Sequence, residues 1–329
     1  MRIEGADLDL TGLEIVPGLV NAHDHLQFAL FPRLGTGPYP NATEWARDIY
    51  HPGHEPVRSH LAVPKHLRLI WGGLRNLIAG VTTVSHHDEY HPVFDTDFPV
   101  RVVKNYGWAH SFEFTSNVRE CYDRTPPGAP FLIHLAEGTD SSATEEIFHL
   151  HALGALTDRT VLIHAVGLGP EGWELVRRAG ASVIWCPRSN LFTLGRTLIR
   201  EALHSGVPIA LGTDSSLTAE GDLLDEIRFA GFFDNAAASQ ILRLHARDDD
   251  WIAAPALGCP PQLVVIAGTI RLIGPRLAYA LPSNLRQLFH PLHIEGRPPV
   301  LVRFDVIRLI EETNVYLDNL RLSGRRVLY

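Results

Sequence analysis

Short apolar runs that alternate with longer helical stretches are the feature that most constrains the fold of this chain. Five runs resemble strands, because they are short and apolar, and they cover residues 80–84, 131–134, 160–164, 181–185 and 207–211. Between them lie helix-like stretches such as Thr144 to Leu153 and Pro170 to Ala179. Strands that alternate with helices indicate parallel βα units, and nearly continuous apolar strands indicate a sheet that is buried on both faces. The pattern predicts an α/β fold.

Length and composition favour one large domain with an appendage. The chain has 329 residues, whereas a β/α barrel takes about 250. Hydrophobic residues make up 45% of the chain, which is enough for a sizeable core and too many for a disordered protein. The formal net charge of −8 argues against nucleic acid or an anionic membrane as a partner, because both need clustered positive charge.

Cysteines and hydropathy exclude further classes of protein. Cys121, Cys186 and Cys259 lie too far apart for a disulfide framework or a zinc ribbon. The N-terminus has no basic start followed by an apolar stretch, so we expect no signal peptide. No apolar run approaches the ~20 residues of a membrane span. We therefore expect a cytoplasmic protein that acts on a small molecule, with homo-oligomerisation left open.

Polar side chains stand where the apolar strands end. His134, His164 and Asp214 follow or close three of these runs, and His23 and His25 follow the apolar stretch from Ile15 to Val20. In a β/α barrel the carboxyl ends of the strands converge on one mouth, where the chemistry takes place. Strand ends that are far apart in the sequence can therefore supply a single site.

The composition of this set indicates a metal centre. On a strand, His23 and His25 face the same side and can reach one ion. Three imidazoles and one carboxylate suit zinc or a ferrous ion with room for water, whose pKa the ion lowers. Glu137, three residues after His134, could shuttle protons. We reject three other histidine pairs, one in a probable helix and two in loop-like sequence: His149/His151, His51/His54 and His290/His293.

The ordered motifs resemble the amidohydrolase superfamily, in particular its branch of metal-dependent deaminases and chlorohydrolases. That branch includes guanine deaminase, the triazine hydrolases and the adenosylhomocysteine/methylthioadenosine deaminases. The resemblance spans roughly Gly12 to Ala230, and its motifs occur in the family's order. The matching segments are Pro17-Gly18-Leu19-Val20-Asn21-Ala22-His23-Asp24-His25-Leu26, Gly80-Val81-Thr82-Thr83-Val84, His134-Leu135-Ala136-Glu137, Ile163-His164-Ala165, Cys186-Pro187-Arg188-Ser189-Asn190 and Leu211-Gly212-Thr213-Asp214-Ser215.

The resemblance implies roles for individual residues. His23, His25, His134 and Asp214 match the ligands of a single metal, and Asp214 also matches the group that takes a proton from the water. Glu137 matches the proton shuttle. His164 matches a histidine that hydrogen-bonds the metal-bound water or the substrate. Weaker candidates for substrate contacts are Glu55, His87, His110, Arg188 and Asn190.

Lysine usage bears on the number of metal ions. Binuclear members of the superfamily carry a carboxylated lysine on the fourth strand, and Lys104 is the only lysine near enough in this sequence. Lys104 stands in a segment that is more typical of an exposed strand end. We therefore expect one divalent ion, zinc before iron.

The resemblance implies a distorted (β/α)8 barrel over residues 16–299, with a small remnant β domain formed by residues 1–15 and 300–329. The short stretch between Val84 and His134 leaves the fourth strand hard to place, and the C-terminal third lacks the family's usual signature. The expected function is hydrolytic deamination of a small aminated heterocycle of the purine, pterin or triazine type. Two alternatives stay open: a cyclic amide hydrolase of the imidazolone-hydrolase type, and a degenerate barrel that binds a ligand without turnover.

Overall fold

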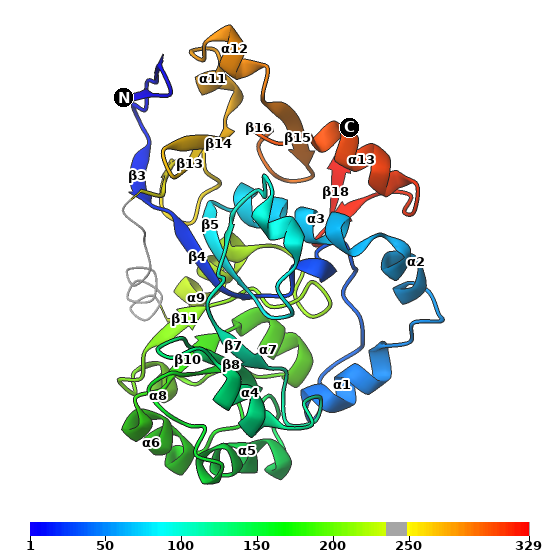
Figure 1. Cartoon of the computed structure of the whole chain (residues 1–329), viewed down its shortest axis with the longest axis vertical. Helices are drawn as coiled ribbons and strands as arrows, with labels where there is room; N and C mark the ends of the chain where they lie inside the picture. Colours follow the sequence, from blue (N-terminus) through cyan, green and yellow to red (C-terminus); the bar gives the residue numbers. More distant parts are fainter. Residues whose placement is uncertain (235–248, 329) are drawn as a thin grey trace.

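The computed structural model describes residues 1–234 and 249–328, and eight parallel strands form its middle and lower parts (Figure 1). Three of them pair in the order β4-β5-β6 and five in the order β11-β10-β9-β8-β7. The prediction of an α/β fold with parallel strands is confirmed. These strands are β4 (Leu19–Asp24), β5 (Val81–His86), β6 (Arg101–Val102), β7 (Gly107–Ala109), β8 (Phe131–Leu135), β9 (Thr160–His164), β10 (Ser182–Trp185) and β11 (Ile209–Leu211).

The two parallel sheets approach each other where β11 ends. The backbone N–H groups of Thr213 and Asp214 both donate to the carbonyl of His23 at 3.0 Å, which ties the end of β11 to β4. Between β6 and β7 the described residues form no ladder. In chain order β7 is the fourth parallel strand, which locates the strand that the sequence left unplaced.

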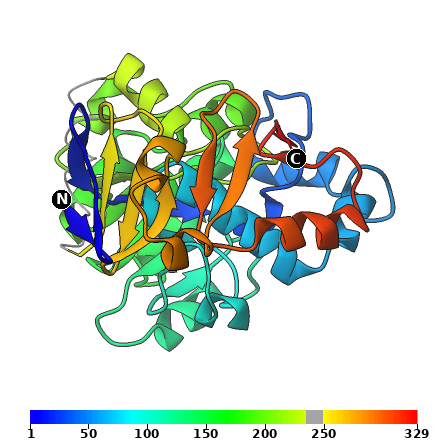
Figure 2. The same cartoon turned by 90° about the horizontal axis from the view of Figure 1, so that it is seen from above.

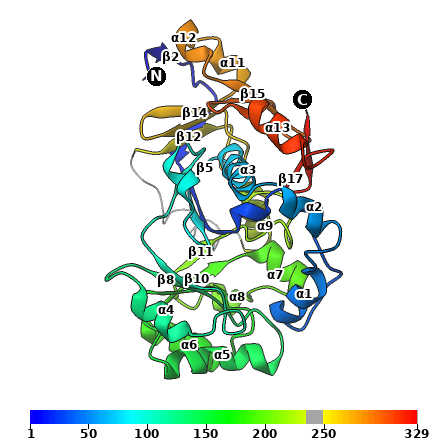
Figure 3. The same cartoon turned by 45° about the vertical axis from the view of Figure 1, so that its right-hand side comes forward.

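Helices follow the strands along the chain, and α4, α5, α6 and α8 lie below the five-stranded sheet in Figures 1 and 3. The expected helix over 170–179 is α6, and the one over 144–153 is α5, which begins three residues earlier because Asp140 caps it by accepting from the Ala143 N–H. The bounds are α1 (Ala42–Ile49), α2 (Val57–Ala62), α3 (Lys65–Ile78), α4 (Val118–Arg124), α5 (Ser141–Ala152), α6 (Pro170–Ala179), α7 (Pro187–Leu194), α8 (Arg200–Leu203), α9 (Leu223–Phe233), α11 (Pro275–Ala278), α12 (Ser283–Arg286), α13 (Val306–Asn314), η1 (Leu26–Phe28) and η2 (Pro92–Asp95).

An antiparallel sheet covers the other end of the molecule (Figure 2). Its strand order is β17-β18-β15-β16-β14-β13-β12-β3, and a separate hairpin, β1-β2, precedes it. The bounds are β1 (Arg2–Ile3), β2 (Ala6–Asp7), β3 (Glu14–Pro17), β12 (Trp251–Ala254), β13 (Leu263–Ile266), β14 (Thr269–Ile273), β15 (His290–Ile294), β16 (Val300–Val302), β17 (Arg321–Leu322) and β18 (Arg325–Leu328).

This sheet is larger than the small remnant that the sequence predicted. Residues 251–294, which we expected inside the barrel, supply four of its strands. The reason is local: β14 and β15 alternate between buried and more accessible side chains, which is the pattern of a half-buried antiparallel strand rather than of a barrel strand. His290 and His293, expected in a loop, lie on β15.

Gly18 joins the two kinds of sheet. The apolar stretch expected as one strand over residues 15–20 divides there, because β3 pairs antiparallel with β12 while β4 pairs parallel with β5. A Cβ added at Gly18 would stand 2.2 Å from Thr82 Oγ1, so only glycine fits this crossing.

Helix α3 packs between β5 and the antiparallel strand β14 and is almost entirely buried. Trp71 and Leu74 are fully buried in the main core, and the Trp71 indole N–H donates to Thr313 Oγ1 of α13 at 2.9 Å. The helix therefore holds the parallel strands and the C-terminal part of the chain in a fixed relation. None of the described helices has the length and apolar character of a membrane span.

Gly212 allows the close approach of β11 to β4. An added Cβ would stand 2.7 Å from the Cβ of His23 and 3.0 Å from its backbone N and O. We expect Gly212→Ala to lower the free energy of unfolding by about 1–3 kcal/mol, the usual cost of overpacking. Urea denaturation measures it, with Gly53→Ala as the control, since an added Cβ there meets open space. Equal losses in the two variants would contradict this explanation.

Candidate active site

The strand ends bring four donor atoms together, as the sequence predicted. His23 lies on β4 and His25 just after it, His134 lies on β8, and Asp214 follows β11. His134 Nε2 is 3.2 Å from His23 Nε2 and 3.4 Å from His25 Nε2. Asp214 Oδ1 is 3.3 Å from His23 Nε2 and 3.5 Å from His25 Nε2. All four side chains are buried.

The spacing of these atoms fits a metal ion. Four donor atoms held about 2.0–2.1 Å from a tetrahedral ion lie about 3.3–3.4 Å from one another. The four distances between these donor atoms given above, 3.2 to 3.5 Å, fall around that value. A divalent cation therefore suits this group of three imidazoles and one carboxylate.

Protonation supports the same interpretation. His134 Nδ1 lies 2.8 Å from the carbonyl of His110, and since a carbonyl can only accept, Nδ1 carries the proton. His134 Nε2 then presents a lone pair to the other imidazoles, the orientation that a histidine ligand adopts. Burial lowers the pKa of His23 to about 3 and that of His134 well below its usual value. Both rings are therefore neutral, as metal ligation requires.

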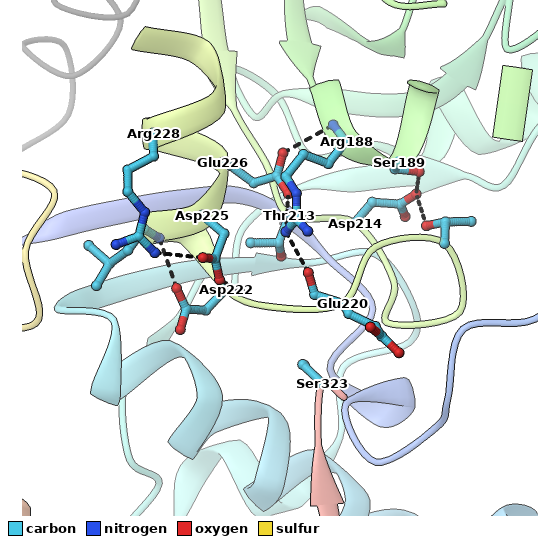
Figure 4. A network of polar contacts seen from close by, with 12 residues as sticks. Arg188, Ser189, Thr213, Asp214, Glu220, Asp222, Asp225, Glu226, Arg228 and Ser323 are labelled. Atoms are coloured by element: carbon cyan, nitrogen blue, oxygen red, sulfur yellow. Dashed lines mark hydrogen bonds and ion pairs between the residues drawn. The ribbon is translucent and has the colours of Figure 1, made fainter. Parts of the chain in front are cut away.

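Hydroxyl groups orient Asp214. Ser189 Oγ donates to Asp214 Oδ2 at 2.5 Å (Figure 4). Thr218 Oγ1 donates to the same oxygen at 3.1 Å. Burial acts to raise the pKa of Asp214, but its interactions with the neighbouring imidazoles, foremost His23, outweigh burial and hold the pKa well below the usual range. Asp214 is thus an anion whose Oδ1 faces the histidines.

Glu137 and His164 stand beside the four-residue group. His164 Nε2 is 3.4 Å from Glu137 Oε1, and His164 Nδ1 is 2.6 Å from Asn190 Oδ1. Burial, together with the negative charges of Asp214 and Glu146, raises the pKa of Glu137 well above its usual value. A carboxyl group whose protonated form is favoured by burial and an imidazole therefore adjoin the donor set, and both can exchange protons with a bound molecule.

Unusual backbone conformations concentrate at these strand ends. Ala136, His164 and Asp214 have φ values of 53°, 75° and 57°, in the left-handed region that non-glycine residues rarely adopt. Glu146 Oε2 accepts a hydrogen bond from the Ala136 N–H at 2.6 Å and so supports the turn between His134 and Glu137. Backbone strain of this kind is typical of functional sites.

Two cavities open onto the group. One of about 550 Å³ is walled by aromatic side chains, and one of about 640 Å³ has a more polar wall with several glutamates. Both reach His110, His134 and Glu137. The aromatic walls of the first, which suit a flat apolar ring, are Phe28, Trp45, Tyr50, Trp108 and Phe114.

Of the weaker candidates for substrate contacts, some lie at the site and others do not. His87 and His110 line the aromatic cavity. Asn190 contacts the site through its hydrogen bond with His164. Arg188 lines neither cavity, and its Nη1 lies 3.6 Å from Glu226 Oε1. The structure does not bring Glu55 to the site: it is exposed, pairs with Arg58 at 2.7 Å and lines neither cavity.

Lys104, Cys186 and His149 lie outside the donor set. The Lys104 side chain is 63% exposed and pairs with Asp95, so it stands outside the donor set, as expected. Cys186 is fully buried, and burial raises the pKa of its thiol well above the usual value. His149 lies on α5 and stacks on Phe112, so it does not form a metal pair with His151.

Several residues around the site were missed from sequence. Asp24 stands between His23 and His25, and Ser189 lies inside the 186–190 motif, so their positions in those motifs were the available signals. Thr218 and the aromatic walls of the cavity lie outside the motifs and gave no signal of their own.

Comparison with known proteins confirms the resemblance to the deaminase and chlorohydrolase branch. Residues 116–245 match the model of the amidohydrolase family. The 5-methylthioadenosine/S-adenosylhomocysteine deaminase of Pyrococcus furiosus is 25% identical over 288 residues, covering 70% of this chain and 66% of the relative. An aminodeoxyfutalosine deaminase of Deinococcus radiodurans is 39% identical over 84 residues, covering 25% of this chain and 20% of the relative. This chain spans 66%, 63% and 58% of the length of three such curated relatives.

Solved structures share the fold. An adenosine deaminase from Xanthomonas campestris with bound zinc superposes with a TM-score of 0.62 at 16% identity, covering 93% of this chain and 85% of that one. The atrazine chlorohydrolase of Arthrobacter aurescens, complexed with zinc, gives a TM-score of 0.61 at 16% identity, covering 93% and 88%.

Proposed function

We propose that this chain, a relative of the deaminase and chlorohydrolase branch of the amidohydrolases, is a metal-dependent deaminase of a small aminated heterocycle. The observation that carries the proposal is the convergence of three imidazole Nε2 atoms and Asp214 Oδ1. Beside them lie the His164 imidazole and Glu137, whose pKa burial raises. A polarising centre next to a proton donor is the equipment that hydrolysis of a ring C–N bond needs.

The proposed ligands of a single divalent ion are His23, His25, His134 and Asp214. When bound, such an ion supplies an activated water as the nucleophile. We propose zinc before iron. The two similar structures with zinc support that choice, while the donor atoms suit both metals.

The proposed roles of the protein groups follow from their charges. Protonated Glu137 would donate its proton to a ring nitrogen, take up the proton that Asp214 accepts from the attacking water, and donate that proton to the departing ammonia. The hydroxyl proton that is lost as the ring carbonyl forms would restore protonated Glu137. Asp214, held as an anion, accepts the proton of the attacking water. His164, oriented by Asn190 at 2.6 Å, hydrogen-bonds the reacting centre. His87 and His110, in the cavity wall, are proposed contacts of the substrate.

The proposed substrate class is purine, pterin or triazine, because the aromatic cavity of about 550 Å³ suits a flat ring with a substituent. Adenine nucleosides are the first candidates within that class, since several relatives are named as methylthioadenosine/adenosylhomocysteine deaminases.

We also propose that the eight parallel strands close into a distorted (β/α)8 barrel. The hydrogen bonds of Thr213 and Asp214 to His23 support closure on one side. The barrel would end before Trp251, where the antiparallel strands begin. A cytoplasmic location, the absence of nucleic-acid and membrane partners, and homo-oligomerisation stay predictions.

A panel of aminated heterocycles tests the function. We expect zinc-loaded protein to release ammonia from at least one adenine, pterin or triazine compound, with a rate at least a hundredfold above that of chelator-treated protein. Coupled ammonia detection and the ultraviolet spectrum of the ring follow the reaction. Ring opening without ammonia would indicate a cyclic amide hydrolase instead, and tight binding without turnover a non-catalytic barrel.

A further inference from the structure

The guanidinium of Arg75 lies buried beneath the donor set, and we infer that it is a positioning residue that holds the two ligand-bearing segments together. Arg75 lies on α3 and its side chain is 2% exposed. It contacts the segment of His23 and His25 on one side and that of Asp214 on the other. The inference rests on the proposed metal site, and it adds a residue that positions the ligands of that site.

The first contact is with Asp24, which stands between His23 and His25. Arg75 Nη2 is 3.7 Å from Asp24 Oδ2, and both side chains are buried. The same oxygen accepts from Asn76 Nδ2 at 2.7 Å and from Asn21 Nδ2 at 3.1 Å. A carboxylate buried in this way needs a nearby cation, and among the described residues Arg75 is the one paired with it.

The second contact is with the backbone that carries Asp214. Arg75 Nη2 donates to the Asp214 carbonyl at 3.2 Å, and Arg75 Nη1 donates to Ser216 Oγ at 2.9 Å. Asp214 has a left-handed φ of 57°. The two hydrogen bonds from Arg75 hold the backbone at Asp214 and Ser216 in place. Ser189 and Thr218 orient the Asp214 carboxylate.

The contact with Ser216 continues into the end of the chain. Ser216 Oγ is 2.9 Å from Ser323 Oγ, at the tip of the β17–β18 hairpin, which Figure 4 shows beside the loop of Glu220. Gly221 N–H donates to the Ser323 carbonyl at 3.0 Å, and Ser323 N–H donates to Ala29. The loop that follows Asp214 is therefore held between Arg75 and the C-terminal hairpin.

Arginine suits this place because one planar group must meet three partners at once. Its fork donates to Ser216 and Asp214 from different nitrogens while its charge faces Asp24. A lysine offers a single ammonium, which can face Asp24 or reach the Asp214 loop but cannot keep all three contacts. Arg75→Lys therefore keeps the positive charge but loses the geometry that joins the two segments.

Zinc affinity tests the inference. We expect Arg75→Lys to weaken zinc binding tenfold to hundredfold, the range seen when groups that orient metal ligands are removed. Competition with a chelator measures the zinc dissociation constant, and the visible spectrum of the cobalt-loaded protein reports whether the ligand geometry changes. Circular dichroism confirms that the variant is folded.

Arg68→Lys is the matched control. Arg68 lies on the same helix and is buried, and within the described part of the chain it donates to the carbonyls of Val63 and Gln27 at 3.0 and 3.2 Å. We expect Arg68→Lys to lower the melting temperature about as much as Arg75→Lys does. Its zinc dissociation constant should stay within threefold of the wild-type value, and its cobalt spectrum should be unchanged. If Arg75→Lys does not fold, the charge-neutral double variant Asp24→Asn/Arg75→Met replaces it, with the same expected loss.

Three outcomes decide the matter. Weaker zinc binding in a folded Arg75 variant, with Arg68→Lys unaffected, supports the inference. Wild-type zinc affinity and cobalt spectrum in the Arg75 variants overturn it and leave the proposed function intact. A wild-type chain that binds no zinc overturns both.

Discussion

Asp214→Asn is expected to weaken zinc binding at least a hundredfold and to lower kcat/KM at least a thousandfold. Asp214 supplies the only negative charge of the four-residue donor set, because the other three members are imidazoles. Its amide replacement would still accept from Ser189 and Thr218 through the carbonyl oxygen. The amide NH2 would then donate to the lone pairs of His23 and His25, which lie 3.3 and 3.5 Å from the present Oδ1.

The metal-free variant is therefore expected to be at least as stable as the metal-free wild type, which separates loss of metal from loss of fold. Zinc content after dialysis, chelator competition and thermal melting give the three readouts. Asp88→Asn is the control, since Asp88 lines the same cavity but pairs with Lys65 at 3.0 Å. An Asp214→Asn protein that retains stoichiometric zinc would show that Asp214 is not a ligand.

The candidate metal site could be predicted from sequence because its parts are local. His134 and His164 each stand at the end of an apolar strand, and parallel strands align their carboxyl ends at one edge. The observed strands β8 and β9 pair in register, His134 with Ile163, so the prediction needed no knowledge of long-range packing. The same logic located Asp214 after β11.

The supporting contacts of the site and the C-terminal sheet could not be predicted, because they depend on packing between segments that are far apart in the sequence. Arg75 reaches Asp24 only because α3 docks between the two kinds of sheet, a consequence of packing around Trp71 and Leu74. The strands β15 and β17 near the C-terminus alternate in burial, so they offer a weaker signal than continuously apolar parallel strands such as β8. Glu55 was inferred from a resemblance of the segment from Trp45 to Glu55. The first residues of that segment lie on α1, and residues 50–55 form an exposed turn that carries Glu55 away from the site.

Glu137→Gln is expected to lower kcat at least a hundredfold while leaving zinc affinity unchanged. Loss of a general acid or base typically costs 10²–10⁴ in rate. Glutamine keeps the volume of the side chain, which is 14% exposed, but it cannot deliver a proton. Since the pKa of Glu137 is raised chiefly by burial, its protonated form is available near neutral pH, and the variant loses that form without gaining a charge.

Zinc affinity in this variant also distinguishes two arrangements of the metal. Glu137, His164 and Asp214 form a second group whose ligand atoms lie within 4.8 Å of one another, and it shares Asp214 with the first. If Glu137 were a ligand, Glu137→Gln would release zinc as Asp214→Asn does. If it is a proton carrier, zinc stays bound and turnover alone falls.

Glu145→Gln provides the control for Glu137→Gln, because Glu145 lies on α5 and lines the polar cavity but is exposed. Its kcat is expected to stay within threefold of the wild type. A wild-type kcat in Glu137→Gln would show that Glu137 is not the proton carrier. His164 would then be the remaining candidate for that role. Because His164 Nε2 is 3.4 Å from Glu137 Oε1, the double variant with His164→Asn would then show whether the two residues act as one unit.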